Sequence, residues 1–200
     1  MNGKERIAAA MRHETPDRVP LMCQLALGHY FLNTDLRPHE IWFTSEGFAE
    51  ALVALQRRYH FDGILINIPG RDPAWREGVS AIEETAEGEV VRWKNGDRTL
   101  VPWDDNAQHT PADPARGRPA FDDFDPDRDF DRLDDWTLYT WGVYHTPVLP
   151  GKAPGLLSEP PNYFFRTIDL VKQQVGDEIS VHGEVFSPFT HLMELFSYED

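Results

Sequence analysis

The spacing of hydrophobic residues changes several times along the chain, and each spacing predicts a different element. Residues 2 to 12 predict a short helix, because Ile7 and Met11 lie four apart on one face among alanines. Residues 19 to 27 are an almost unbroken apolar run, which is typical of a strand buried on both faces. Residues 28 to 33 interrupt that run and predict a loop at the carboxyl end of the strand.

Helical spacing returns in the next segment. Ser45 is a typical cap residue, and the apolar side chains after it recur at steps of four and three, at Phe48, Leu52, Leu55 and Tyr59. Residues 61 to 69 are a second apolar run and predict a second buried strand. Strand, helix and strand joined by short links predict a right-handed parallel βαβ unit.

The period changes to two between residues 79 and 103. Three alternating runs are joined at Glu87-Gly88 and Asn95-Gly96, and Asn-Gly between such runs favours a tight hairpin. We therefore expect an antiparallel β-meander inserted into the parallel scheme. Residues 104 to 135 follow as an acidic loop with eight aspartates between 122 and 135. A solvated linker is favoured over a calcium loop, which needs tighter spacing and a glycine turn.

The carboxyl-terminal part returns to the βα pattern. Residues 136 to 161 are aromatic and proline-rich and give no clear element. A helix is expected from about Asn162 to Gly176, followed by a strand at 179 to 185. Ser187-Pro188 then predicts the start of another helix, because a cap residue precedes proline. Residues 182 to 187 therefore lie where parallel α/β folds carry their chemistry.

His182 and Glu184 are the candidate catalytic residues. They lie two apart on the last predicted strand, so their side chains point to the same face. Such a pair can bind a metal or pass a proton. A histidine bonded to a neighbouring carboxylate in a packed interior is an equally good interpretation. Ser187 adds the backbone N–H groups of a helix start, which favour an anionic part of a substrate.

Further residues are candidates for substrate binding. His29 and Tyr30 follow the first predicted strand and Asn67 follows the second, so they converge on one rim if the strands are neighbours. Loop hydrogen bonding for His29 and Asn67 and packing for Tyr30 are the structural alternatives. His145 lies in an aromatic segment and is interpreted either as a lid residue or as a surface residue. Cys23, within the first apolar run, is interpreted as a small core residue.

The overall composition narrows the function classes. The formal net charge of -15 argues against a nucleic-acid or anionic-membrane surface and favours small molecules or proteins as partners. A single cysteine excludes an internal disulfide framework and is typical of the reducing cytoplasm. No apolar run approaches the ~18 residues needed to cross a bilayer. The dinucleotide, phosphate-loop, nucleophile-elbow and zincin motifs are also absent from the sequence.

Three segments resemble the uroporphyrinogen decarboxylase (URO-D) superfamily. Residues 4 to 20 are similar to its opening helix and the Asp-Arg-x-Pro lead into the first strand, and Phe61-Asp-Gly-Ile-Leu-Ile looks like its second strand. Gly183 with Ser187-Pro188-Phe189-Thr190 is similar to its glycine and Pro-aromatic-Thr segment. The resemblance implies a TIM (β/α)8 barrel of the α/β class. Residues 1 to 200 are expected to be its incomplete, amino-terminal half.

The superfamily resemblance implies two chemistries. Uroporphyrinogen decarboxylases remove acetate carboxyl groups from a tetrapyrrole without a cofactor, and cobamide-dependent methyltransferases use zinc to move a methyl group between a corrinoid and an acceptor. The tetrapyrrole-gripping arginines fall here on Leu25 and His29, and the catalytic aspartate falls near residues 67 to 69, where there is no acid. We therefore rank corrinoid-linked methyl transfer first, decarboxylation of a tetrapyrrole or polycarboxylate second, and a non-catalytic fragment third.

The methyltransferase interpretation carries further expectations. Its zinc ligands would lie beyond residue 200, and a corrinoid protein would be a partner beside the small-molecule substrate. The 200-residue chain alone is expected to be inactive, because an open half-barrel lacks the opposite wall of the site. A homodimer is left open.

Overall fold

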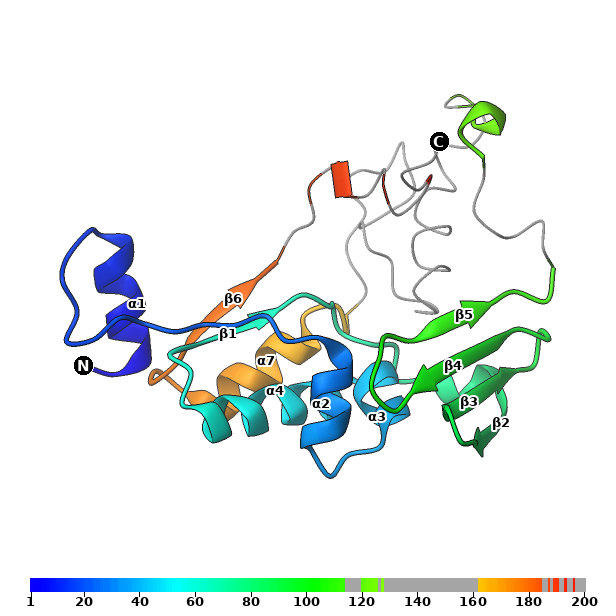
Figure 1. Ribbon diagram of the computed structural model, residues 1–200, viewed down its shortest axis with the longest axis horizontal. Helices are drawn as coiled ribbons and strands as arrows, with labels where there is room; N and C mark the ends of the chain where they lie inside the picture. The colour runs from blue at the N-terminus through cyan, green and yellow to red at the C-terminus, as the bar shows by residue number, and fades with distance from the viewer. Residues whose placement is uncertain are drawn as a thin grey trace.

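The computed structural model describes residues 1–113, 120–125, 127, 162–184, 187, 189–190, 193 and 196. It is a mixed α/β structure with one parallel and one antiparallel sheet (Figure 1). In chain order its elements are α1 (Gly3–Met11), α2 (Leu27–Asn33), α3 (Pro38–Phe43), α4 (Ser45–Tyr59), β1 (Gly63–Ile66), η1 (Trp75–Gly78), β2 (Val79–Glu84), β3 (Gly88–Trp93), β4 (Arg98–Pro102), β5 (Gln108–Thr110), η3 (Phe121–Asp123), α7 (Arg166–Val175) and β6 (Ser180–Gly183).

The second and last predicted strands form a parallel pair. β1 and β6 run side by side with Gly63 opposite Ser180 and Ile66 opposite Gly183. Helices α4 and α7 pack together and cover one face of this pair (Figure 1). Ile64 and Ile66 join the buried core on that face. A parallel pair of strands in a mixed α/β structure is confirmed, and no sheet within the described ranges closes into a barrel.

The first apolar run is extended but is not a strand of this sheet, so that prediction was wrong. Val19 is 85% exposed, and Cys23 is also exposed instead of lying in the core. Pro20 has no N–H to donate. Leu21 bonds to Asp62, the residue before β1, through Asp62 N to Leu21 O at 2.7 Å and Leu21 N to Asp62 Oδ2 at 2.9 Å. Apolar composition alone did not determine burial, because only the end of the run, at Leu25 and Leu27, packs against the core.

Residues 27 to 33 form helix α2, although a loop was predicted there. Leu27, Tyr30 and Phe31 follow helical spacing and are buried. The amino-terminal cap is Ala26, whose side chain offers no hydrogen bond, so the usual start signal is missing. Gly28, at which the predicted loop began, lies inside the helix.

Two other helix starts differ from the prediction. The cap of α4 is Thr44, whose hydroxyl accepts the N–H of Gly47 at 2.9 Å, and Ser45 is the first helical residue. Helix α7 begins at Arg166, four residues after the expected start at Asn162. The apolar stripe of α4 is confirmed, with its first three members buried: Phe48, Leu52 and Leu55.

The β-meander is confirmed and extends further than predicted. β2, β3 and β4 pair in order as antiparallel neighbours. A fourth strand, β5, lies within the predicted acidic loop and pairs antiparallel with β4. Its three residues, Gln-His-Thr, alternate too briefly to give a strand signal. None of the described helices has both the length and the apolar character needed to cross a membrane.

Gly28 permits a close approach between α2 and the turn after β4. A Cβ built at this position would lie 1.8 Å from the carbonyl oxygen of Asp104, so an alanine would overlap rigid backbone. We expect Gly28→Ala to lower the free energy of unfolding by about 2 to 3 kcal/mol, measured by urea denaturation. Gly78→Ala is the matched control, because its nearest neighbour lies at 3.4 Å. Equal stability of the two variants would contradict the close approach.

Candidate functional site

The face of the β1–β6 pair that turns away from the helices is polar. Because side chains alternate along a strand and Ile64 faces the core, Leu65 and Asn67 point to the other side. His182 is opposite Leu65 in the register and therefore shares that side. We call this surface the open face, and it carries Leu65, Asn67, Ser180, His182 and Glu184.

Glu184 connects the open face to the first apolar run. Gln24 Nε2 donates to Glu184 Oε2 at 2.9 Å, across 160 positions of sequence. The run and β1 point in the same direction, because Leu21 meets Asp62 at the start of β1 and Gln24 meets Glu184 at its end. The carboxyl ends of the run, β1 and β6 therefore lie close together here.

His182 and Glu184 share a face but have different partners. His182 Nε2 lies 2.7 Å from Ser180 Oγ, two positions earlier on the same strand. The carboxylate of Glu184 is instead held by the amide of Gln24. Both side chains are half-buried, so they are oriented while still facing outward. An imidazole and a carboxylate held in this way can exchange protons with a ligand on the open face.

The remaining rim candidates are distributed differently. Asn67 is half-buried directly after β1. Ser187 is exposed, and its hydroxyl accepts the N–H of Thr190 at 3.2 Å, as a helix cap does. That contact confirms the predicted helix start. His145 and the rest of residues 128 to 161 lie outside the described residues.

His29 and Tyr30 face α4 and lie off the open face. His29 Nε2 is 2.8 Å from Tyr59 Oη at the last residue of α4. Tyr30 is 5% exposed and packs edge-on against Phe48, with ring centres 5.9 Å apart. Burial raises the pKa of Tyr30 above its ordinary value of 10.0. These contacts join α2 to α4, and they correct the prediction that both residues lie in a rim loop.

Asp62 was not identified from the sequence, although it joins two of the segments that carry the family resemblance. It is 1% exposed and accepts from Arg6 Nη1 at 3.0 Å, Arg18 Nη2 at 2.7 Å and Leu21 N at 2.9 Å. Burial raises the pKa of Asp62, but these donors outweigh it and hold the pKa below its ordinary value. The adjacent charged residues Asp17 and Arg18 indicated a charge network in the sequence, but they did not identify Asp62 as a member of it.

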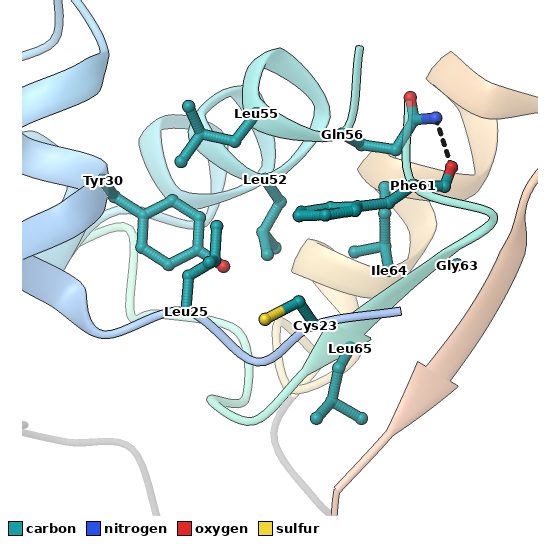
Figure 2. Close-up of a pocket in the computed structure, with 10 residues that line it drawn as sticks. All are labelled: Cys23, Leu25, Tyr30, Leu52, Leu55, Gln56, Phe61, Gly63, Ile64 and Leu65. Atoms are coloured by element: carbon teal, nitrogen blue, oxygen red, sulfur yellow. Dashed lines mark hydrogen bonds between the residues drawn. The ribbon is translucent and has the colours of Figure 1, made fainter. Parts of the chain in front are cut away.

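Two features of the described residues bear on cofactor binding. Within these ranges no group of three or more histidine, cysteine, aspartate or glutamate side chains could hold a metal ion. Figure 2 shows a gap beneath the first apolar run, lined by Cys23 and Leu25 on one side and by residues of α4 and β1 on the other. Its volume is about 10 Å³, which suits a single water molecule and excludes a corrinoid.

Comparisons with known proteins add no relative. A scan against protein-family models, a search of curated proteins and a search of solved structures found no match for this chain. The candidate function therefore depends on the residues and their geometry.

Proposed function

We propose that the open face is part of the wall of a small-molecule cavity in a URO-D-type (β/α)8 barrel, and that the reaction there is corrinoid-linked methyl transfer. The observation that supports this proposal is the parallel order of the first apolar run, β1 and β6, with polar side chains at their carboxyl ends. In TIM barrels the catalytic side chains lie at this end of the strands.

The residues of the open face have defined roles in the proposal. His182, whose ring is oriented by Ser180, takes the proton of the methyl acceptor as the acceptor is methylated and then releases that proton to solvent. Glu184, held by Gln24, balances the charge on that imidazole and contacts the acceptor. Asn67 contributes an amide to the same surface. The small gap under the first apolar run is too small for a corrinoid, and the described residues include no three-residue metal group, so the proposal places no step on either group here.

Decarboxylation of a tetrapyrrole or polycarboxylate ranks second in the proposal. Its gripping arginines are replaced by Leu25 and His29, and both side chains turn toward the α2–α4 side: Leu25 lines the small gap and His29 contacts Tyr59. Neither residue supplies positive charge to the open face. A polyanionic substrate needs such fixed charge for binding.

A ligand titration followed by backbone amide NMR tests the proposal. Methylcobalamin is expected to shift the amide signals of Asn67, His182 and Glu184, and Glu184→Gln is expected to weaken that response by about tenfold. Glu87→Gln, at an exposed position in the meander, is the control and should respond like the unmodified chain. A response to uroporphyrin alone would reverse the ranking of the two reactions. Shifts confined to other surfaces, or none with either ligand, would contradict the proposal.

A further inference from the structure

Arg71 is a buried arginine whose terminal nitrogens have no partner. The residue is 5% exposed, and its Nε donates to the carbonyl oxygen of Trp42 at 2.8 Å. Its guanidinium lies 4.9 Å from the centre of the Trp42 ring. Nη1 and Nη2 are fully shielded and make no hydrogen bond within the described part of the chain. Leaving buried charged donors unsatisfied is costly, so this group calls for an explanation.

The backbone at Gly70 and Arg71 is fixed by two hydrogen bonds to helix starts. The Arg71 N–H donates to Ser45 Oγ at 2.7 Å, at the first residue of the 15-residue helix α4. The preceding Gly70 N–H donates to Phe164 O at 2.7 Å, just before α7 begins. The backbone of residues 70 and 71 is thus held at the amino ends of α4 and α7, and the guanidinium lies against Trp42, in the last turn of α3.

A second buried donor, in the first turn of α7, also lacks a partner. Thr167 lies in the first turn of α7, is 1% exposed, and its Oγ1 has no hydrogen bond in the described ranges. Helix α7 has no side-chain cap at its amino end. The start of α7, which Gly70 contacts through Phe164, therefore carries an unpartnered hydroxyl and no side-chain cap.

Neighbouring carboxylates do not neutralise Arg71. Asp72 Oδ1 accepts the N–H of Ala74 at 2.8 Å, and Glu46 Oε1 accepts from Arg166 Nε at 3.1 Å. Burial lowers the pKa of Arg71 to about 9, and no acidic group offsets that effect. The guanidinium is therefore still a cation at neutral pH.

We infer that the junction of the loop after β1 with the amino ends of α4 and α7 binds a small oxyanion, the carboxylate or phosphate group of a small molecule. The two terminal nitrogens of Arg71 form a fork that matches two oxygens of such a group. Thr167 and the start of α7 supply further donors. Shielding from water strengthens these ionic hydrogen bonds. The inference goes beyond methyl transfer, because it concerns a residue that the proposed reaction does not use.

NMR of the arginine side chains tests the inference on the unmodified chain. Sodium phosphate and sodium malonate are titrated separately, and sodium chloride at matched ionic strength is the reference. We expect a saturable shift of the Arg71 Nε and Cζ signals with phosphate or with malonate, and the more effective anion identifies the class of ligand. An Arg71 signal that responds to neither anion up to about 100 mM would overturn the inference.

Variants add a second readout through thermal unfolding. Phosphate or malonate is expected to raise the Tm of the unmodified chain above its value in chloride. Arg71→Lys, which keeps the charge and loses the fork, should bind the anion about tenfold more weakly, and Arg71→Met should lose the response. Arg57→Met, at an exposed position of α4, should retain it. An equal rise in Tm for Arg71→Met would overturn the inference, and if that variant does not fold the NMR titration decides.

Discussion

Glu89→Ala is expected to lower the free energy of unfolding by about 3 to 5 kcal/mol, as removal of one member of a buried charged network does. Glu89 is 0% exposed, and its carboxylate accepts from His39 N at 2.8 Å, His39 Nδ1 at 2.7 Å and Arg37 Nε at 2.5 Å. These bonds hold the start of α3 against β3. Without the carboxylate, the buried donors of His39 have no acceptor. Urea denaturation measures the loss.

The same network predicts a pH dependence with a definite sign. Burial raises the pKa of Glu89, but the bonds from His39 and Arg37 outweigh it and hold the pKa below the ordinary value of 4.5. The contribution to stability is therefore complete above the unfolded-state pKa and is lost as the pH falls through the folded-state value. Glu89→Gln should show a weaker dependence in this acidic range.

Glu87→Gln is the control for Glu89, because Glu87 is exposed two positions earlier, in the turn that precedes β3. Its stability should stay within about 0.5 kcal/mol of the unmodified chain. If Glu89→Ala unfolds at the same urea concentration as this control, the network does not stabilise the contact between α3 and β3.

Asp62→Ala is the second substitution with a large expected effect, again about 3 to 5 kcal/mol. The carboxylate is 1% exposed and joins Arg6 of α1, Arg18 of the following segment and the N–H of Leu21. Its loss leaves Arg6, which is mostly covered, with only the more exposed Asp17 as a partner. The amino-terminal helix and the first apolar run would then lose their shared attachment to β1.

Two comparisons test the role of Asp62. Asp17→Asn should cost less than Asp62→Ala, because the Asp17 side chain is 45% exposed and its ion pairs are screened by water. The folded-state pKa of Asp62 is lowered, so its contribution should be present above its ordinary value of 3.8 and decline as the pH falls below it. A stability loss for Asp17→Asn that equals or exceeds the loss for Asp62→Ala would place the attachment elsewhere.

Local signals in the sequence were sufficient where the structure depends on local patterns. The Asn95-Gly96 turn and alternating residues predicted the meander, and the apolar runs predicted β1 and β6. Helix α2 was not predicted, because Gly28 was interpreted as the start of a loop. Its glycine is required by the backbone of Asp104, a neighbour distant in sequence.

The hydrogen-bond partners of the candidate site residues could not be predicted from the sequence. Period-two spacing put His182 and Glu184 on one face, and the structure agrees. The bonds from Ser180 and Gln24 that orient them depend on tertiary packing. The same holds for Arg71, whose burial follows from contacts with α3 and α4 and leaves no local pattern in the sequence.

The open face requires that β1 lies between the first apolar run and β6, with all three segments running in the same direction. Scalar couplings across hydrogen bonds, measured by NMR, test it most directly at Asp62. We expect a coupling from Asp62 N to the carbonyl carbon of Leu21, where the hydrogen bond measures 2.7 Å, and another from Ser180 N to the carbonyl carbon of Asp62, where it measures 3.1 Å. Couplings that pair β1 with β6 in the antiparallel sense, or with a different strand, would contradict the open face and the function proposed for it.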